Sequence, residues 1–282
     1  MELISHTLVM GRLNSSTAFY GSKVPQAMKV ATFNANSMRV RLPIILDWIG
    51  REAPDILFLQ ETKVQDKDFP VNAVEEAGYH AVFRGQKSYN GVAILSKSPL
   101  DDVKTQLSVE GVDEARFVSG RIGDIHVINA YVPQGFEAGS DKFRFKLAWL
   151  EHLLGYITAN YDPSSQLLVA GDFNVALTDM DLYDPDGFRG EVGFHPDEQA
   201  MIEGFFNWGL VDIFRKHIRE GNQYTFWDYR IPSGFKRNMG WRIDYILGTA
   251  SQAERSRSVW IDREARAMEK PSDHTFLVVE FD

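Results

Sequence analysis

Residues 54–63 read Pro-Asp-Ile-Leu-Phe-Leu-Gln-Glu-Thr-Lys, an apolar run that ends at the carboxylate of Glu61. A short, continuous apolar run of this kind is typical of a strand that is buried on both faces of a sheet. The ends of such strands are where a rigid scaffold gathers polar groups from distant parts of a chain. Five further stretches also end an apolar run with an acid or an amide, at residues 33–36, 129–131, 171–174, 242–245 and 272–274. This repetition predicts one shared site at the ends of several strands.

Strands and helices mix along the chain without strict alternation. Helices are predicted near 42–49, where Pro43 suits a first turn, at 141–160, where Ser140 or Asp141 is placed to cap the helix, and near 196–208. Strands are predicted at 30–33, 56–59, 91–95, 117–132 with breaks at Gly120 and Gly123, 167–170, 224–229, 241–248, 257–262 and 274–281. Because several strands are consecutive, the order favours an α/β fold of two packed sheets with helices outside over a doubly wound sheet.

Composition narrows the class of protein. The 282 residues suit one large domain, and the regular signals run from residue 28 to residue 282. Residues 1–27 are interpreted as a flexible extension, or as an upstream start with Met28 as the true beginning. The sequence has no cysteine, which excludes disulfides, thiolate zinc sites and cysteine nucleophiles. It also has no run of about 20 apolar residues, the length that a membrane-spanning helix needs.

The charge balance is acidic. A net charge of −9 argues mildly against a nucleic-acid binder, which usually carries a basic footprint. Thirty Lys and Arg residues still allow a local basic face on an acidic body. A bound divalent cation would also offset part of the repulsion at an acidic site.

Each candidate side chain also has a local interpretation. Glu61 suits a surface ion pair with the lysine two residues later, and Asp244 suits an ion pair with Arg242. Asp172 and Asn174 point to one face if the strand continues through them. After a glycine, however, Asp and Asn equally form a turn. For single residues these alternatives stay open.

Taken together, the candidates are oxygen donors with little nitrogen and no sulfur. Such ligands suit Mg²⁺ or Mn²⁺, whereas a zinc site would use more His or Cys. His274 beside spare carboxylates supplies acid–base chemistry near neutral pH. The donors available to stabilise a reacting phosphate are Asn34, Tyr131, Asn174 and His274. The set therefore indicates metal-assisted attack of water on a phosphate ester, and no phosphate loop, nucleophile elbow or zinc-protease motif competes with it.

Five motifs occur in the order of one known family. They are Leu-Gln-Glu-Thr-Lys at 59–63, Tyr-Val-Pro-Gln-Gly at 131–135, Gly-Asp-Phe-Asn at 171–174, Trp-Gly-Leu-Val-Asp at 208–212 and Met-Glu-Lys-Pro-Ser-Asp-His at 268–274. From Met28 to its C-terminus the chain resembles the exodeoxyribonuclease III family of abasic-site endonucleases, within the DNase I-like endonuclease/exonuclease/phosphatase superfamily. The resemblance implies a four-layer α/β sandwich, Mg²⁺ dependence and hydrolysis of double-stranded DNA. The implied reactions are incision 5′ to abasic sites, 3′→5′ exonuclease cleavage and removal of blocked 3′ ends.

The resemblance also implies catalytic roles for five residues. Asp172 would activate water or protonate the leaving oxygen, and Asn174 would hold the phosphate or the water. His274 would contact the scissile phosphate and be oriented by Asp244. Tyr131 would bind the phosphate as well.

Metal and DNA contacts follow from the same resemblance. Glu61 would be the principal metal ligand, and the other ligands would be Asn34, Asp172, Asn174 and Asp273. The residues expected to contact DNA are Asn36, Lys63, Arg116, Lys142, Lys146, Phe226, Trp227 and Trp241. Aromatic side chains suit a flipped-out abasic sugar, although Phe and Trp at strand ends are also common in cores. Lys142 and Lys146 are four residues apart and equally suit a solvated helix face.

Two positions depart from the family pattern. Ser37 stands where the family usually has glycine, and a changed turn there would shift Asn34 or Asn36. Phe226 stands where many bacterial members have Trp, so the balance between exonuclease and abasic-site activity stays open. Two other functions also stay open: a phosphodiesterase or phosphatase for phospholipid or inositol phosphates, and an inactive DNA-binding module. The expected protein is a cytoplasmic monomer, nucleoid-associated in a bacterium, with no membrane or obligate protein partner.

Overall fold

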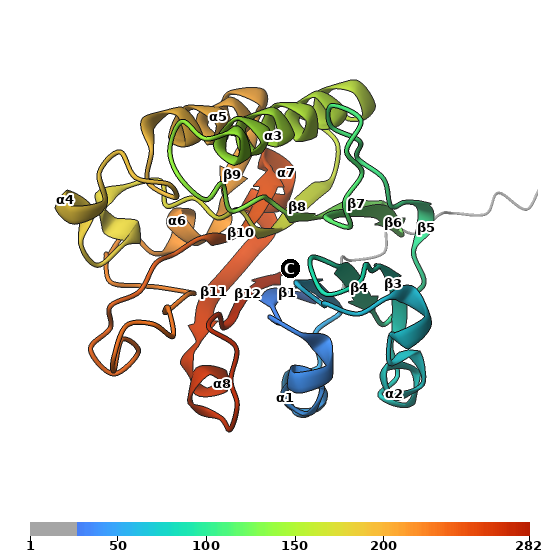
Figure 1. Cartoon of the computed structure of the whole chain (residues 1–282). Helices are drawn as coiled ribbons and strands as arrows, with labels where there is room; N and C mark the ends of the chain where they lie inside the picture. The colour runs from blue at the N-terminus through green and yellow to red at the C-terminus, as the bar shows by residue number, and fades with distance from the viewer. Residues whose placement is uncertain (1–26) are drawn as a thin grey trace, which may run out of the picture.

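Two six-stranded sheets pack face to face, and helices cover their outer faces (Figure 1). The computed structural model describes residues 27–282, so the extension expected at 1–27 lies, apart from residue 27, outside the described residues. The first sheet has the order β11-β12-β1-β2-β4-β3, and its strands are β1 (Met28–Asn34), β2 (Ile56–Gln60), β3 (His80–Arg84), β4 (Val92–Ser96), β11 (Ser256–Asp262) and β12 (Phe276–Phe281). The second has the order β5-β6-β7-β8-β10-β9, and its strands are β5 (Asp101–Lys104), β6 (Phe117–Ile122), β7 (Ile125–Tyr131), β8 (Leu167–Asp172), β9 (Leu210–Asp212) and β10 (Asp244–Thr249).

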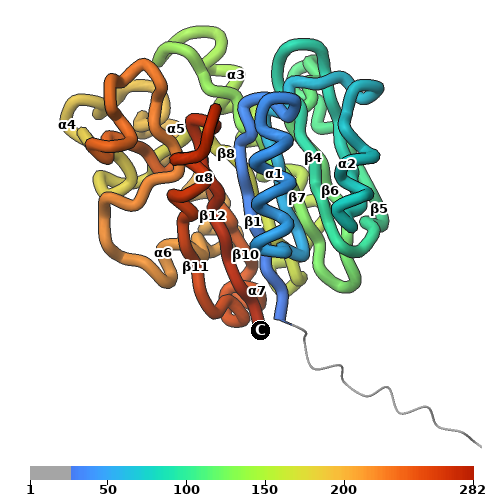
Figure 2. The backbone as a smooth tube through the Cα atoms, turned by 90° about the horizontal axis from the view of Figure 1, so that it is seen from below, coloured from blue at the N-terminus to red at the C-terminus, as the bar shows by residue number. Residues whose placement is uncertain are grey.

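The longer helices form the two outer layers. Helices α1 (Met38–Glu52) and α2 (Val71–Glu76) cover the first sheet and lie in front in the view from below (Figure 2). Helices α3 (Asp141–Asn160) and α5 (Pro196–Trp208) cover the second sheet (Figure 1). The shorter helices are α4 (Pro185–Phe188), α6 (Ile213–His217), α7 (Ala250–Arg255) and α8 (Arg263–Ala267), with single 3₁₀ turns at η1 (Asp66–Asp68) and η2 (Asp179–Asp181). The four-layer α/β sandwich and the helices at 141–160 and 196–208 are confirmed.

Strand β2 shows why these layers form. Ile56 and Phe58 point into the core between the two sheets, whereas Leu57 and Leu59 point outward under the helices of the first sheet. All four side chains are fully or almost fully buried, as the continuous apolar run predicts. Burial of each contributes roughly 1.5–3 kcal/mol relative to exposure.

The strand directions bring several strand ends to one edge of the sandwich. β1 and β2 are parallel, with Asn34 opposite Gln60, and β7 and β8 are parallel, with Tyr131 opposite Asp172. β10 is antiparallel to β8 and begins at Asp244, which lies opposite Asp172. The carboxyl ends of the two central parallel pairs and the start of β10 therefore meet across the space between the sheets.

Three local predictions are wrong. Residues 224–229 form no strand, and Phe226 makes only isolated bridges to Trp241 and His274. Gly120 lies inside β6, so the turn in this region is the one at Gly123. α1 begins at Met38, which places Pro43 inside the helix rather than in its first turn.

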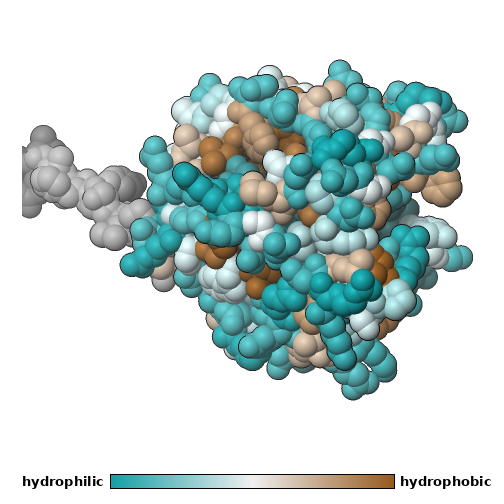
Figure 3. Space-filling view, turned by 90° about the vertical axis from the view of Figure 1, so that its left-hand side faces the viewer, coloured by the Kyte–Doolittle hydropathy of each residue, from teal (hydrophilic) through white to brown (hydrophobic). Residues whose placement is uncertain are grey.

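None of the helices within residues 27–282 combines the length and apolar character that a bilayer crossing requires. The face that carries α4 is mostly hydrophilic, with separate apolar patches between the polar groups (Figure 3).

Candidate active site

The amide of Asn34 joins the ends of the two sheets. Its Nδ2 donates to Oε1 of Glu61 at 2.8 Å and to Oδ2 of Asp172 at 2.8 Å. Asn34 ends β1 and Asp172 ends β8, so this one side chain connects carboxylates that belong to different sheets. Its Oδ1 accepts the backbone N–H of Asn36 at 2.9 Å, which fixes the orientation of the amide.

Glu61 directly follows β2 and forms the predicted ion pair with Lys63. Nζ of Lys63 lies 2.8 Å from Oε2 of Glu61, and both side chains are partly exposed, at 28% and 19%. Burial raises the pKa of the Glu61 carboxyl, but Lys63 and the Asn34 amide outweigh burial and lower that pKa below its ordinary value. Both residues have positive φ, 49° for Glu61 and 53° for Lys63, a conformation that surrounding structure must hold. The ion pair is thus present, and it lies in the site rather than apart from it.

A second layer of polar contacts surrounds Glu61. Asn36 donates through Nδ2 to Oδ1 of Asp273 at 2.9 Å, and its Oδ1 accepts Nζ of Lys63 at 2.5 Å. The Ser272 hydroxyl donates to the backbone carbonyl of Asn34 at 2.7 Å. The turn before β12 is therefore tied to the ends of β1 and β2, and Asp273 joins the same cluster.

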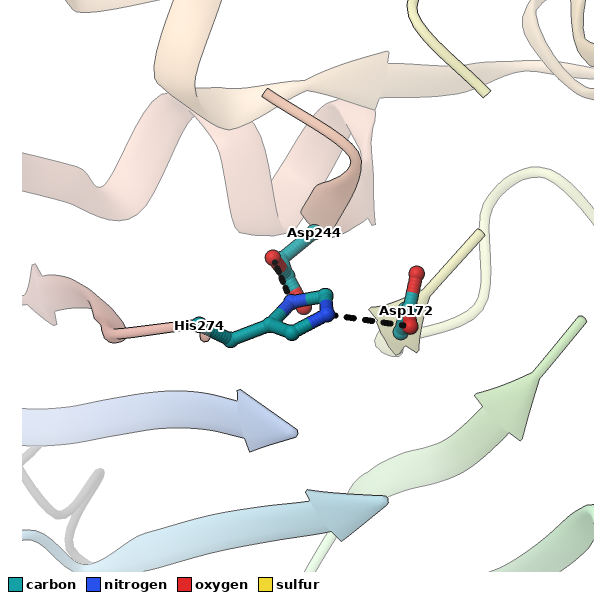
Figure 4. Close-up of side chains that lie close together, drawn as sticks. All are labelled: Asp172, Asp244 and His274. Atoms are coloured by element: carbon teal, nitrogen blue, oxygen red, sulfur yellow. Dashed lines mark hydrogen bonds and ion pairs between the residues drawn. The ribbon is translucent and has the colours of Figure 1, made fainter. Parts of the chain in front are cut away.

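His274 lies between two buried carboxylates (Figure 4). Its Nδ1 is 2.8 Å from Oδ2 of Asp244, and its Nε2 is 3.8 Å from Oδ2 of Asp172. Burial lowers the pKa of His274, but the two carboxylates outweigh burial and raise it to about 10. The ring is therefore an imidazolium near neutral pH, with Asp244 holding one N–H and the other N–H facing Asp172.

Asp172 is the most strongly shifted acid of the site. Burial raises the pKa of its carboxyl, His274 opposes that rise, Asp244 adds to it, and the resulting pKa is about 7. A carboxyl with a pKa in this range can both take and give a proton near neutral pH. A buried acid with such a pKa beside a charged partner is a candidate for proton transfer.

Asn174 follows in a turn, and the turn also places it in the site. Its backbone N–H donates to Oδ1 of Asp172 at 2.9 Å, and its φ is 53°. Its Nδ2 lies 3.0 Å from the Val132 carbonyl and 3.3 Å from Oδ2 of Asp172. The strand thus ends at Asp172, and the turn, not a shared strand face, brings the two side chains together. Gly171 is required before them because a Cβ there would lie 1.9 Å from the Ala130 carbonyl oxygen.

Tyr131 and Arg116 form the side of the site at the end of β7. The guanidinium of Arg116 lies over the Tyr131 ring, 4.7 Å from its centre. The Tyr131 side chain is buried, and burial followed by the charge of Glu61 raises its pKa well above the ordinary value. Tyr131 therefore stays protonated and offers a hydroxyl donor toward the acids.

The donor chemistry fits Mg²⁺ on the side of Glu61. The groups gathered there are the carboxylates of Glu61 and Asp273 and the amides of Asn34 and Asn36. The Asn34 nitrogen is turned to Glu61, and its oxygen accepts the Asn36 N–H. Asp172, Asp244 and His274 also offer ligand atoms within 4.8 Å of one another. That second group is hydrogen-bonded through His274 Nδ1, however, and a hard cation prefers oxygen. The oxygen donors beside Glu61 therefore suit a hard cation better than the group around the imidazole does.

The alternative ion pair of Asp244 with Arg242 does not form. Arg242 is fully buried and pairs with Asp181 at 2.7 Å and Asp212 at 2.9 Å. Asp244 Oδ2 contacts His274 instead, while its Oδ1 has no hydrogen-bond partner. Arg242 thus fixes the chain just before β10, away from the catalytic groups.

A cavity of ≈ 700 Å³ opens beside Asn174. Phe226 and Trp241 line it and are partly exposed, as expected of aromatic side chains that contact DNA. Among the other lining residues, Gln134 and Ile243 belong to the stretches at 131–135 and 242–245, whereas Phe188 and Gly193 have no predicted role. Phe188 comes from the short helix α4 and packs edge-on against Trp241 with ring centres 4.8 Å apart. No local pattern around residue 188 marks it as part of a site.

Two of the predicted DNA contacts are wrong because their side chains are fully buried. Lys146 lies inside the protein with Nζ 2.5 Å from Oε1 of Glu198, so it reaches neither DNA nor solvent. Trp227 packs against Phe235 with ring centres 5.0 Å apart, and it lies in the interior rather than in the cavity. Lys142, by contrast, is exposed, and its Nζ lies 4.9 Å from the ring centre of Phe136 at the cavity rim.

One predicted strand-end amide also has a structural role. Asn129 is buried within β7 and donates to the carbonyls of Leu59 and Ala93 at 2.9 and 2.8 Å. It also accepts Nε2 of Gln60 at 2.8 Å. It therefore binds the two sheets together below the site and does not face the catalytic groups.

Ser37 lies at the turn where the family usually has glycine. Its φ is 108°, in the region that glycine favours and side chains avoid. Its backbone N–H nevertheless donates to the Glu61 carbonyl at 2.8 Å, and Asn34 and Asn36 keep their contacts in the site. The substitution therefore leaves the catalytic geometry in place and is expected to cost backbone strain.

The comparisons with known proteins concern the family and the fold of the chain. The sequence model of the family described as "Endonuclease/Exonuclease/phosphatase family" matches residues 31–274. An exodeoxyribonuclease III from Haemophilus influenzae is 36% identical over 267 residues, which cover 90% of this chain and 100% of that protein. A solved AP endonuclease from Archaeoglobus fulgidus has a TM-score of 0.88 and 44% identity, covering 90% of this chain and 99% of that one. A solved 3′ phosphatase from Neisseria, bound to product DNA hairpin, has a TM-score of 0.85 and 36% identity, covering 90% and 99%.

Proposed function

The chain belongs to the endonuclease/exonuclease/phosphatase family, and from this premise we propose that it is a magnesium-dependent DNA-repair nuclease. It hydrolyses phosphoric ester bonds in double-stranded DNA. Its reactions are incision 5′ to abasic sites, 3′→5′ exonuclease cleavage and cleaning of blocked 3′ ends. The relatives support each activity, since they include an exodeoxyribonuclease III, an AP endonuclease and a 3′ phosphatase.

The observation that carries the proposal is the bridge made by Asn34. One amide holds the carboxylates of Glu61 and Asp172 at 2.8 Å each, so a metal position and a proton-transfer group lie side by side. Phosphoester hydrolysis needs these two functions next to each other. An inactive DNA-binding module would have no reason to keep buried acids together, since isolated buried charges are costly.

Glu61, with Asn34 and Asp273 nearby, would hold Mg²⁺. When bound, Mg²⁺ supplies a Lewis acid that polarises phosphoryl oxygens and neutralises developing charge. The protein groups supply the rest. The imidazolium of His274 donates a hydrogen bond to a phosphate oxygen, and Asp244 keeps that ring charged and oriented. The hydroxyl of Tyr131 donates a further hydrogen bond to the phosphate.

Asp172 moves the proton. Its pKa of about 7 lets the carboxylate take a proton from an attacking water or give one to the leaving oxygen. Asn174, held by Asp172 and Val132, positions the water or the phosphate. Which of the two proton transfers Asp172 performs depends on where the substrate phosphate lies.

The cavity beside Asn174 supports an abasic substrate. Phe226, Trp241 and Ile243 present an apolar wall to a sugar that carries no base. Extruding such a sugar costs less than extruding a paired nucleotide because no base pair has to be broken. A phospholipid or inositol phosphate would use the same acids without needing this aromatic wall.

The test is product analysis on a gel. Wild-type protein is expected to nick a duplex that contains a stable abasic analogue, and to shorten an undamaged recessed duplex, only when Mg²⁺ is present. EDTA should stop both reactions, and Glu61→Ala and Asp172→Ala should abolish them, whereas Asp101→Ala on the exposed edge strand β5 should not. Cleavage of inositol phosphates with no cleavage of DNA would replace the proposal with the phosphatase alternative. Salt-sensitive duplex binding without turnover would indicate the inactive module.

The proposal includes the physical state of the protein. We expect a monomer without an obligate protein partner, working in the cytoplasm and associated with the nucleoid if the host is a bacterium. Mn²⁺ is expected to replace Mg²⁺, because both are hard cations that take oxygen ligands. Light scattering coupled to gel filtration tests the monomer, and metal titration of the cleavage rate tests the ion.

A further inference from the structure

Lys146 is a charged side chain enclosed completely by protein. It lies on α3 with 0% exposure, and three oxygen atoms surround its ammonium group. These are the carbonyl of Asn174 at 2.8 Å, the carbonyl of Gln134 at 3.2 Å and Oε1 of Glu198 at 2.5 Å. The two carbonyls accept hydrogen bonds from the ammonium, and Oε1 of Glu198 forms an ion pair with it. Two of these partners belong to loops that form the active site and its cavity.

Glu198 extends the network to Gly193, which also lines the cavity. Glu198 lies on α5, is also fully buried, and accepts two backbone N–H groups through Oε2, from Gly193 at 2.7 Å and His195 at 3.1 Å. Gly193 packs against Trp241, because a Cβ at Gly193 would lie only 3.1 Å from Cζ3 of that ring. The carbonyl of Gly193 also accepts the Ala176 N–H at 2.7 Å. The network thus reaches Asn174 through Lys146 and Trp241 through Glu198.

We propose that the buried Lys146–Glu198 pair is a positioning device that sets Asn174 and Trp241 at a fixed distance from each other. It thereby aligns the phosphate-handling group with the wall that receives the sugar. The inference rests on the proposed nuclease function for its catalytic consequence, but not for the contacts themselves. Neither Lys146 nor Glu198 touches the substrate, so each acts through the residue that it holds.

The backbone of Asn174 needs such support. Its φ of 53° is in the left-handed region, which persists in a non-glycine residue only when the surroundings over-determine it. The Asn174 side chain contacts Asp172 and Val132, but its carbonyl points the other way, to Lys146. Removing the ammonium would leave that buried carbonyl without its donor and free the turn to move.

A purely structural ion pair is the alternative, and it predicts something different. Replacing both members of a buried pair with neutral groups of similar shape often leaves stability unchanged. Lys146→Met combined with Glu198→Gln keeps the volume, and the Gln carbonyl oxygen can still accept from Gly193 and His195. If the pair is only structural, a stably folded double variant should be fully active. If it positions Asn174, the double variant should fold and still be slow.

The experiment distinguishes the contact of Lys146 with Asn174 from the contact of Gly193 with Trp241. Steady-state kinetics on a duplex with a stable abasic analogue are measured for the full-length double variant and for Gly193→Ala. The double variant is expected to lose about tenfold to 10²-fold in kcat with KM little changed, since misplacement by about 1 Å costs up to that much. Gly193→Ala keeps the Lys146–Asn174 contact and adds a Cβ 3.1 Å from the Trp241 ring and 3.5 Å from the Asn174 carbonyl, at a strained φ of 89°. Because the contact with Trp241 is the tighter one, this variant is expected to raise KM more than it lowers kcat. Lys97→Met, in an exposed ion pair with Asp55 at the opposite end of the first sheet, is the matched control and should match wild type.

A second readout does not depend on activity. In protein labelled with ¹⁵N-asparagine, the side-chain amide signal of Asn174 should shift in the double variant, and in protein labelled with 5-fluorotryptophan the Trp241 signal should shift in Gly193→Ala. Native melting temperature with unchanged kcat and unchanged Asn174 signal in the double variant would overturn the proposal. If the double variant does not fold, Glu198→Gln alone carries the test, because it removes the ion pair and keeps an acceptor for the N–H groups of Gly193 and His195. An unchanged kcat and an unchanged Asn174 signal in that variant would overturn the proposal. Inactivity of the wild-type protein on DNA would refute the nuclease function, while the two NMR shifts would still decide the positioning role.

Discussion

Asp244→Asn isolates the charge that keeps His274 protonated. Oδ2 of Asp244 accepts from His274 Nδ1 at 2.8 Å, and Oδ1 has no partner. An asparagine can therefore keep its carbonyl oxygen on the ring and put its amide nitrogen in the position of Oδ1. The orientation and tautomer of the ring should survive, and only the negative charge should be lost.

The structure sets the size of the effect. The pKa of His274 is about 10 against an ordinary value of 6.5, and the carboxylate of Asp244 is the largest contribution in the raising direction. A shift of this size corresponds to an interaction on the order of 5 kcal/mol, as an upper bound. Without that charge the pKa of His274 should fall, because burial lowers it and only Asp172 and Asp273 still raise it, so a larger fraction of the ring should be neutral at pH 7.5. Loss of one charged donor to the transition state is expected to lower kcat about 10²–10³-fold.

The assay is single-turnover cleavage of a stable abasic analogue between pH 5.5 and 9, with ring ¹⁵N shifts recorded for His274. The deficit of the variant should shrink as the pH falls, because protonation restores the imidazolium. Asp101→Asn, which changes an exposed acid in the same way, should match wild type throughout. A variant rate within about twofold of wild type at every pH would refute the reasoning, as would a His274 midpoint that stays near 10; a twofold change is only about 0.4 kcal/mol.

Three further predictions concern stability. Ser37 at φ 108° carries backbone strain of about 1–3 kcal/mol. Ser37→Gly should therefore raise the free energy of unfolding by about 1 kcal/mol, once the greater chain entropy of glycine in the unfolded state is subtracted. A lower free energy of unfolding for the variant, measured by urea denaturation, would contradict this. Mg²⁺ at 100 times its dissociation constant should stabilise the wild type by about 2.7 kcal/mol and leave Glu61→Gln nearly unaffected, which a thermal-shift titration measures. In EDTA, the stability due to the raised pKa of His274 is complete below pH 6.5 and is lost as the pH rises through about 10. The raised pKa of Asp172 acts in the same direction, with its contribution complete below pH 3.8 and lost as the pH rises through about 7. Wild-type stability should therefore fall from pH 6.5 to 10, and His274→Gln should flatten the upper part of that fall; an equally steep fall in the variant would argue against the assignment.

The strand-end acids were predictable because their signal is local. An apolar run predicts a buried strand, and the acid two residues after Leu59 or Ala170 must lie near its end wherever the strand goes in the fold. The central role of Asn34 was not predictable in the same way. Its amide bridges Glu61 and Asp172, which are 27 and 138 residues away, and no local pattern encodes such a contact.

The segment 224–229 shows how a local pattern misleads. Tyr, Thr, Phe and Trp are typical strand residues, but a strand also needs a neighbour that runs beside it. Thr225 and Phe226 bond to the Trp241 carbonyl, before β10 begins, while the N–H of Trp227 bonds to the Asp273 carbonyl, before β12 begins. The segment therefore crosses between the ends of the two sheets and cannot pair along either. This position puts Phe226 on the cavity and Trp227 in the interior.

Lys142 and Lys146 show that the local sequence can also mislead about the burial of a side chain. They are one helical turn apart on α3, and the sequence gives no reason to treat them differently. The difference comes from α5, which brings Glu198 over the helix 52 residues later and removes Lys146 from solvent. Because Lys146 is buried against Glu198, it cannot contact DNA as predicted and donates instead to the carbonyl of Asn174. Enclosing two charges is costly, and here the ammonium of Lys146 pairs with Glu198 and donates to the carbonyls of Asn174 and Gln134, two residues that line the cavity. Their arrangement is therefore better explained by what it holds in place than by any gain in stability.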